Sequence, residues 1–596
     1  MSRLLLSEVQ SGISKSNIRK IVFQVCPYIF SPLNINRLSE SLSHYLSGFY
    51  DSHFIFSPPF FQKLLDIYFQ KCGASRLLIN KVYRFGVAEV DFLIWRCVSL
   101  KPVNIGGHTA YQNRVLTQLR KFYPDAINSL SSSTWQILDK FWNLDLSEID
   151  SLMKDRYSSF GPEPRLPSDM LRAILVSVEF KITSYTRFAA DLKENHLHAI
   201  ISGFEVGDTP GVGTFYDFHK RLWLSDSKNL SNAIHPPKEK PQKPKGKEEK
   251  AAPVEKITVE DLFRRFEENP PSDMAPCAKL WNIFNTFFLQ NSVAQNLISL
   301  KHLALAGDGT PVYTSAQERK TRTCNCLEKG IRDCKCNRIY HQPDCDIGWD
   351  SHRNRFYFGY DLYMLTASDS ENDLPVFPFL SPASRHDSHG FLYNWFSMKQ
   401  MLPEATVTKL LLDSAHDAMP YYEYCKENNI VPFIDMNWKC GRPPVYKDDI
   451  TIGSDGIPLC PKGFPMKKAA VEPKKGRIKY RCPKITCKGG TVHCTCDDPC
   501  SDAKYGRNVH LVLKDNPRLF NTPPRGSNEW KLEYNARTSA ERCNKREKID
   551  YKLEDGKYRS SMMWYCRLFA IMMCQHLDAW VLPKTSPLKD LFEQAA

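Results

Sequence analysis

A charged segment near the carboxyl end of the chain carries residue types that suit chemistry at a phosphate. The run YNARTSAERCNKREK places Tyr534, Arg537, Glu541 and Lys548 at successive offsets of three, four and seven residues. On a helix, which turns about 100° per residue, these side chains share one stripe. A carboxylate there can hold a divalent cation, while the cations and the phenol contact phosphates. Thr538 and Glu541 also fit a capping box, which would start the helix after Arg537, and a solvated charged helix is the plainer alternative.

Two further carboxylates end apolar runs upstream. Asp308 lies in residues 303–309 (LALAGDG), and Asp413 ends residues 407–413 (VTKLLLD). Each run predicts a short buried strand that delivers one acid at its end, and the glycines beside Asp308 would let a ligand approach the backbone. Asp417 is the rival for the second acid, but Asp413 directly follows its strand. An acid that only caps a turn is the alternative for either position.

The segments between these acids alternate in a defined order. Apolar patterning predicts strands over 356–367, 374–380 and 430–434, and helices over 389–402 and 419–428. Together with the two acid-bearing strands, the order is β-β-β-α-β-α-β. The carboxylates fall on the first and fourth strands, and the third acid falls on a late helix.

That order, with its three acids, resembles the RNase H-like catalytic domain of DDE transposases. The Y-(2)-R-(3)-E-(6)-K spacing is similar to the signature of a large group of bacterial insertion-sequence transposases, and the resemblance covers about residues 160–580. Further matching motifs are Gly307-Asp308-Gly309-Thr310, Gly348-Trp349-Asp350-Ser351 and Asp413-Ser414-Ala415-His416-Asp417. The resemblance implies an α/β fold, in which an RNase H-like mixed-sheet catalytic domain follows a mainly α-helical N-terminal region. The catalytic domain would span 257–590, with a Cys-rich insertion at about 436–508.

The resemblance also implies roles for the residues of the motifs. The implied catalytic triad is Asp308, Asp413 and Glu541. The implied contacts to transposon-end DNA are Tyr534, Arg537 and Lys548. Three converging carboxylates repel one another and are best stabilised by two Mg²⁺ or Mn²⁺ ions, which prefer oxygen ligands and would promote in-line displacement at phosphorus.

The expected activity is therefore DNA cleavage and strand transfer of an insertion sequence. The expected partners are double-stranded DNA, as terminal inverted repeats and as target, and a second copy of the chain, since joining two ends generally requires two protomers. An RNase H-like nuclease without strand transfer and a non-catalytic DNA-binding protein derived from a transposase are the alternatives.

Length, charge and hydropathy agree with a multidomain protein that has a polyanionic partner. The chain has 596 residues, a formal net charge of +14 and a pI near 8.8. The apolar stretch at the amino end is too short for a signal peptide. The apolar segment 561–582 contains Arg567 and Asp578, which predicts a buried helix rather than a membrane span. We therefore expect a cytoplasmic, nucleoid-associated protein without a membrane partner.

Many of the 20 cysteines fall in two clusters, and without a secretory signal they are not expected to form disulfides. Four thiolates at short spacing suit a structural zinc ion. The first candidate cluster comprises Cys324, Cys326, Cys334 and Cys336. The second comprises Cys460, Cys482, Cys487, Cys494, Cys496 and Cys500, and two of its turns resemble zinc-ribbon knuckles although C-x-x-C pairs are missing. Reduced thiols in a loop-rich insertion are the alternative.

The amino-terminal half divides at a Lys/Pro-rich linker, residues 235–256, whose composition should not pack. Residues 151–234 resemble the helical domain ahead of the catalytic domain in these transposases, with helix starts near Pro167 and Gly211. We expect this domain to bind the terminal repeats. The candidate phosphate contacts are Lys220, Arg221 and Arg187, with plain surface cations as the alternative. Residues 1–150 are expected to be mostly helical and carry no motif that assigns a role.

Overall fold

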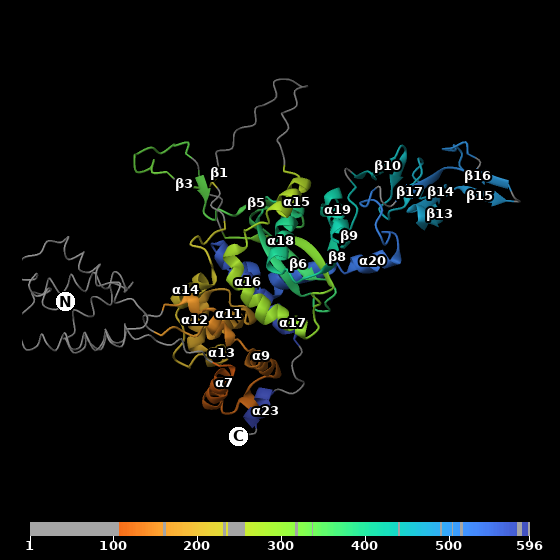
Figure 1. Ribbon diagram of the computed structural model, residues 1–596. Helices are drawn as coiled ribbons and strands as arrows, with labels where there is room; N and C mark the ends of the chain where they lie inside the picture. Colours follow the sequence, from red (N-terminus) through yellow and green to blue (C-terminus); the bar gives the residue numbers. More distant parts are fainter. Residues whose placement is uncertain are drawn as a thin grey trace, which may run out of the picture. The chain divides into compact units, whose positions relative to one another are not determined.

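The computed structural model describes most of the chain beyond residue 106 (Figure 1). The described residues are 107–158, 163–230, 234–235, 257–315, 320–322, 324–336, 338–438, 441–488, 491–503, 505–512, 516–580 and 587–593. All of them belong to one compact unit formed by 101–159 and 163–596. The predictions for residues 1–106, and for the linker from 236 to 256, lie outside the described residues. His235, the first linker residue of the prediction, instead ends the short strand β1 (Ile234–His235).

The described part that precedes the linker is helical. Its longer helices are α7 (His108–Phe122), α9 (Ser132–Trp142), α11 (Pro167–Glu179), α12 (Tyr185–Glu194), α13 (His196–Ser202) and α14 (Val212–Leu222). As predicted, α11 begins at a proline, whose missing N–H costs nothing in the first turn. Nearly all of α11 is buried because α13 and α22 (Ser561–Ala579) both pack against it.

A six-stranded mixed sheet forms the centre of the second half. Its strand order is β5-β6-β2-β8-β9, and β7 also pairs with β6. The strands are β2 (Leu303–Tyr313), β5 (Asp346–Asp350), β6 (Arg355–Ala367), β7 (Pro375–Pro382), β8 (Val407–Leu412) and β9 (Val431–Ile434). The strand β2 is antiparallel to β6 and parallel to β8, which is in turn parallel to β9. The mixed α/β class expected from the sequence is therefore confirmed.

The predicted strands and helices form in the predicted order, with two corrections. The sheet also contains β5, which lies between β2 and β6 in the chain and was not predicted. The helices α18 (Asp387–Met401) and α19 (Met419–Glu427) make the crossovers on either side of β8. Asp413 directly follows β8, as predicted. Asp308, however, does not end its strand, because β2 continues to Tyr313 through antiparallel pairing with β6. The apolar run ended before the strand did, since the last part of β2 is only partly buried.

The helix α22 is buried along almost its whole length, as the sequence predicted. It is fixed to β7 by two long-range hydrogen bonds. The Leu380 N–H donates to the Tyr565 hydroxyl at 2.9 Å, and His576 Nε2 lies 2.8 Å from the Pro375 carbonyl oxygen. Among the described helices, none combines the length and the apolar character needed to cross a membrane.

The insertion after β9 consists of small sheets with their own apolar core. One sheet contains β10 (Val445–Lys447), β11 (Ile450–Ile452) and β12 (Pro458–Leu459), and a second contains β13 (Lys467–Glu472), β14 (Arg477–Arg481) and β17 (Asn508–Val512). A hairpin of β15 (Ile485–Lys488) and β16 (Thr491–Cys494) projects from them. Buried Ile452 and Leu511 belong to the core of this insertion, which is separate from that of the central sheet.

Candidate active site and metal centre

The strands β2 and β8 bring Asp308 and Asp413 level with each other. Ala306 pairs with Leu411 in the parallel register, and the two acids lie two residues further along each strand. Because side chains alternate between the faces of a sheet, both acids emerge on the face that carries Ala306 and Leu411. The strand pairing ends here, since the Asp413 carboxylate turns the chain by accepting a hydrogen bond from the Ala415 N–H at 3.1 Å.

Two helices cover that face and bring the third acid to it. The helices α20 (Asn528–Asn535) and α21 (Thr538–Lys545) bury Trp530 and Ala540 against Ala306 and Leu411. Glu541 directly follows Ala540. One turn later on α21, Asn544 Nδ2 donates to Asp308 Oδ2 at 3.1 Å. Three elements that are distant in sequence therefore bring the three predicted acids to one region of the sheet.

The two strand acids have opposite electrostatic environments. Burial raises the pKa of Asp308 to about 7; Arg537 opposes this shift, and the charges of Asp413 and Glu541 add to it. Burial acts in the same sense on Asp413, but the hydrogen bond from His416 Nδ1, at 2.6 Å, lowers the pKa of Asp413 below its usual value. Neighbouring carboxyl groups whose pKa values are shifted in opposite directions are typical of acid–base and metal sites.

The helical stripe expected for the charged segment was wrong in detail. Tyr534 lies in the last turn of the preceding helix α20, Arg537 lies between the two helices, and α21 starts at Thr538. The capping box does not form, because the Thr538 hydroxyl donates to the Asn535 carbonyl at 2.9 Å instead. The alternative in which Tyr534 and Arg537 precede the helix is therefore correct.

Arg537 nevertheless lies directly beside the acids. Its guanidinium forms an ion pair with Glu541 at 2.6 Å and lies over the ring of Tyr534, with 5.8 Å between guanidinium carbon and ring centroid. The Tyr534 ring in turn stacks on Trp530, at a centroid distance of 4.5 Å. The Glu541 carboxylate is half exposed, so it remains accessible to a ligand from solvent.

Lys548 has protein partners in this structure. It lies in the π-helical turn Arg546–Asp550 that follows α21. Its Nζ donates to the Pro311 carbonyl at 2.5 Å and forms an ion pair with Glu554 at 3.3 Å. Lys548 therefore fastens this turn to the far part of β2.

The other candidate DNA contacts lie on the helices before the linker. Lys220 on α14 pairs with Asp217 at 2.9 Å and is half exposed. The guanidinium of Arg221 lies 4.5 Å from the ring centroid of Tyr157. Arg187 on α12 is exposed.

The structure explains why Asp417 is a poor rival for Asp413. Its side chain is fully buried and its two oxygens are already engaged. Oδ1 accepts from the Tyr422 hydroxyl at 2.8 Å, whereas Oδ2 accepts from Arg518 at 2.7 Å and from the Asn437 N–H at 2.8 Å. Asp417 therefore ties the end of β8 to the insertion, and the preference for Asp413 agrees with this geometry.

The first cysteine cluster forms a compact group of potential metal ligands. The four sulfur atoms of Cys324, Cys326, Cys334 and Cys336 all lie within 4.8 Å of one another. The Cys324–Cys334 and Cys326–Cys336 sulfur distances are 3.5 and 3.6 Å. Tetrahedral zinc with bonds of ~2.3 Å would need sulfur separations of roughly 3.8 Å, so the group can hold such an ion.

The electrostatics of this cluster also favour a cation. Hydrogen bonds from the Cys326 backbone N–H and from neighbouring thiols lower the pKa of Cys324 to about 6, so its sulfur is a thiolate near neutral pH. Hydrogen bonding to Cys324 raises the pKa of Cys326 to about 12. A metal ion would remove that competition for protons, because it binds all four sulfurs as thiolates.

The second cysteine cluster is looser. Cys460 and Cys482 are buried, Cys494 is exposed, and Cys496 and Cys500 are partly exposed. The charges of Cys460 and Cys482 add to burial in raising the pKa of Cys500, which indicates that these three sulfurs are neighbours. Cys487 lies on β15, and its side chain is outside the described residues.

Within the described ranges, only the first cysteine cluster brings three or more potential ligand atoms of Cys, His, Asp or Glu within 4.8 Å of one another. The acids Asp308, Asp413 and Glu541 are therefore neighbours without being that tightly gathered.

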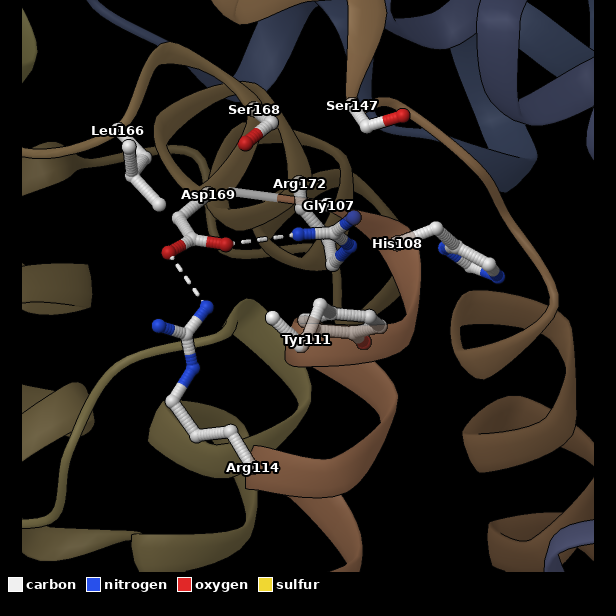
Figure 2. Close-up of a pocket in the computed structure, with 10 residues that line it drawn as sticks. Gly107, His108, Tyr111, Arg114, Ser147, Leu166, Ser168, Asp169 and Arg172 are labelled. Carbon is white, nitrogen blue, oxygen red and sulfur yellow. Dashed lines mark hydrogen bonds and ion pairs between the residues drawn. The ribbon is translucent and has the colours of Figure 1, made fainter. Parts of the chain in front are cut away.

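A separate pocket lies among the helices before the linker, and its chemistry differs from that of the acids (Figure 2). Asp169 accepts from Arg114 at 2.8 Å and from Arg172 at 2.9 Å, and the Arg172 guanidinium lies 3.5 Å from the ring centroid of Tyr111. Burial raises the pKa of Asp169 to about 6, with the two arginines opposing it. This buried ion-pair network joins α7 to α11 and serves the packing of the helices.

Sequence reasoning missed two acids next to Asp308. Asp361 lies in the apolar run of β6, and Asp387 lies in the first turn of α18. The charge of Asp387 adds to the raised pKa of Asp308. A single acid inside the run FYFGYDLYMLTA was the available signal for Asp361. Nothing in the local sequence distinguished Asp387.

Comparison with known proteins gave no relatives: the sequence matches no family model and no curated protein.

Proposed function

We propose that this protein is a DDE-type transposase that cleaves and joins DNA at the acids Asp308, Asp413 and Glu541. The convergence of these three acids from β2, the end of β8 and α21 supports the proposal most strongly. The order of the strands and helices along the chain, which agrees with the order predicted from the resemblance to an RNase H-like catalytic domain, also supports it. This function requires every one of the three acids.

The carboxylates fit magnesium or manganese. Asp308 and Asp413 each use one oxygen in hydrogen bonds with the protein, to Asn544 and to His416 respectively, which leaves the second oxygen for a cation. Bound divalent cations would activate a water or a 3′-hydroxyl and stabilise the leaving oxygen. Glu541 would exchange its partner Arg537 for a cation, which would free the guanidinium for a phosphate.

The neighbouring residues position the acids. His416 holds Asp413 through Nδ1, and its Nε2 lies 3.0 Å from the Tyr363 hydroxyl, which fixes the orientation of the ring. Asn544 holds Asp308 in the same way from α21. Such supporting hydrogen bonds keep metal ligands in place before the substrate arrives.

The charges of the chain suit DNA as the substrate. The formal net charge is +14, and Arg537 pairs with Glu541 and lies over the ring of Tyr534. In the proposed complex, Lys548, Lys220 and Arg221 contact the transposon ends, and two copies of the chain hold the two ends at the nucleoid. Lys548 would have to leave its protein partners to do so.

Zinc is the ion that best fits the first cysteine cluster, because four thiolates at these separations match its tetrahedral geometry. We propose a structural role for it, since the cluster has no open ligand position. The neighbouring thiols Cys460, Cys482 and Cys500 are candidates for a second structural ion in the insertion.

A strand-transfer assay tests the proposed function. Oligonucleotides carrying the inverted repeats that flank the gene are incubated with the purified chain and Mg²⁺. Asp308→Ala should abolish cleavage and joining but retain DNA binding. Glu533→Gln is the matched control, because this nearby carboxylate on α20 is occupied by Lys409 at 2.7 Å.

The outcomes separate the three candidate functions. Cleavage without joined products would identify a nuclease. Binding without any Mg²⁺-dependent cleavage would identify a non-catalytic DNA-binding protein. DNA cleavage by the Asp308→Ala variant would show that these three acids are not the active site.

A further inference from the structure

Asp361 is a buried acid with an oxygen that has no partner. It lies in the middle of β6, between Pro311 of β2 and Ser381 of β7 in the antiparallel registers. Only 6% of the residue is exposed, and its Oδ2 is fully buried without a hydrogen-bond donor. A carboxylate oxygen in this state is rare, because burial removes its water and nothing replaces it.

Two glycines leave a small space around this oxygen. A Cβ atom at residue 309 of β2 would lie 3.2 Å from Asp361 Oδ2, and one at residue 390 of α18 would lie 3.8 Å from it. The same Cβ position at Gly309 would lie 3.1 Å from Oδ1 of Asp387. Two carboxylates from different elements therefore meet over Gly309, next to Asp308.

The nearby cations do not neutralise this pair. Lys548 and Arg385 both lower the pKa of Asp361, but burial and the charges of Asp387 and Asp308 act against them. Neither cation forms an ion pair with Asp361. Lys548 is bound to a carbonyl of β2 and to Glu554, while the Arg385 guanidinium lies over the ring of Tyr393 at 4.0 Å. Two carboxylates therefore line the space over Gly309, and neither Lys548 nor Arg385 forms an ion pair with Asp361. Burial raises the pKa of Asp387, and His416 and His386 act to lower it.

We propose that Asp361 and Asp387 bind a divalent cation in the space over Gly309, beside Asp308. Carboxylate oxygens are the ligands that Mg²⁺ and Mn²⁺ prefer, and the rest of the coordination sphere would be water or a substrate oxygen. This inference deepens the proposed function, on which it rests for the use of the ion, by adding two ligands outside the three predicted acids. Binding of the ion itself does not depend on that function and is measured without DNA.

Binding of Mn²⁺ to the full chain tests the proposal. Free Mn²⁺ is counted by electron paramagnetic resonance during a titration of the metal-stripped protein. Asp361→Asn should lose one Mn²⁺ per chain, or bind it at least tenfold more weakly. Gly309→Ala should have the same effect while it keeps every carboxylate, because its methyl group would occupy the space between the acids.

Two control variants sharpen the result. Asp344 is another buried acid with an unpartnered oxygen, but its other oxygen accepts from the Tyr360 hydroxyl at 3.0 Å. Asp344→Asn should keep all of the bound Mn²⁺. Asp413→Asn should weaken the binding of a different Mn²⁺ ion and leave the affinity for the ion over Gly309 unchanged.

Wild-type stoichiometry and affinity in both Asp361→Asn and Gly309→Ala would overturn the proposal and would indicate that Asp361 is simply protonated. If Asp361→Asn fails to fold by circular dichroism, Gly309→Ala alone decides. DNA cleavage is scored separately. A chain that binds this ion but never cuts DNA would refute the proposed function and support the cation site. A chain that cuts DNA without binding this ion would support the proposed function and refute the cation site.

Discussion

Asp308 on β2 lies level with Asp413, which directly follows the adjacent parallel strand β8, yet the pKa values of the two carboxyl groups are shifted in opposite directions. Burial and neighbouring acids raise the pKa of Asp308 to about 7, whereas the hydrogen bond from His416 lowers that of Asp413. In the absence of a cation, Asp413 is therefore charged at neutral pH and Asp308 is only partly so. A cation that binds to Asp413 first would then favour the charged form of Asp308.

Replacing His416 should weaken metal binding at Asp413. His416→Ala removes the 2.6 Å hydrogen bond that favours the charged carboxylate and orients it. Loss of such a supporting partner typically weakens metal affinity about 10–100-fold. The measurement is the Mg²⁺ concentration that gives half-maximal cleavage. His302→Gln, an exposed residue just before β2, is the control and should leave that concentration unchanged.

The metal-free protein should lose stability as the pH rises from about 4 to 7. Between these values the unfolded chain has a charged Asp308, with a pKa near 3.8, while the folded chain keeps the proton. The folded state therefore binds more protons than the unfolded state. The contribution of Asp308 to the unfolding free energy is fully present below pH 4, and it is lost as the pH rises through the folded pKa. The shift corresponds to about 4 kcal/mol at most.

Urea unfolding at pH 5 and pH 8 measures this effect. Asp308→Asn should be more stable than wild type at pH 8 by a few kcal/mol, with a much smaller difference at pH 5. Mg²⁺ should stabilise the wild type at pH 8 and have less effect on the variant. An equal difference between the two proteins at both pH values would contradict the raised pKa.

Arg537 should contribute to DNA binding through its charge. Arg537→Ala removes the cation that partners Glu541, and the slope of log affinity against log salt should fall by ~1 if Arg537 contacts a phosphate. The control is Arg542→Ala on the following helix α21, since Arg542 already forms an ion pair with Asp373 at 2.6 Å. Equal losses in both variants would indicate a general charge effect. The measurement is fluorescence anisotropy with end DNA at several salt concentrations.

The first cysteine cluster should hold one zinc ion per chain. Cys336→Ser removes one of the four sulfurs and should lower the zinc content measured by mass spectrometry of the purified protein. Cys345→Ala is the control, because this buried thiol lies close in sequence but outside the group. Equal zinc content in the two variants would show that the cluster is not the site.

Gly203 should be required by the ion-pair network among the helices. Its φ is +94°, and an added Cβ would lie 2.4 Å from Asp169 Oδ1, so Gly203→Ala both strains the backbone and displaces the carboxylate between Arg114 and Arg172. Gly207 has φ +89° with nothing within 4 Å of its Cβ position. Gly207→Ala should cost about 1 kcal/mol of unfolding free energy, and Gly203→Ala about 3 kcal/mol or more. The urea unfolding midpoints of the two variants give the comparison. Equal losses of unfolding free energy would indicate that backbone strain alone, and not displacement of Asp169, causes the effect.

The sequence by itself determined where the buried strands and helices lie. The run before Asp413 is apolar because β8 is buried in the sheet, and α22 is apolar because α11 and β7 enclose it. Local burial leaves a local pattern, so these elements could be predicted. The end of β2 could not be, because its last residues are held by pairing with β6 rather than by burial.

Only the tertiary structure decided which polar groups have partners. Asp413 and Asp417 are four residues apart and look alike in sequence. Arg518, 101 residues away from Asp417, donates a hydrogen bond to Asp417, whereas Asp413 keeps one oxygen for a ligand. Lys548 is held by Pro311, 237 residues away, and Asp361 meets Asp387 over a glycine of a third element. Charge and hydrogen-bond satisfaction depend on neighbours brought together by the fold, and no local pattern records them.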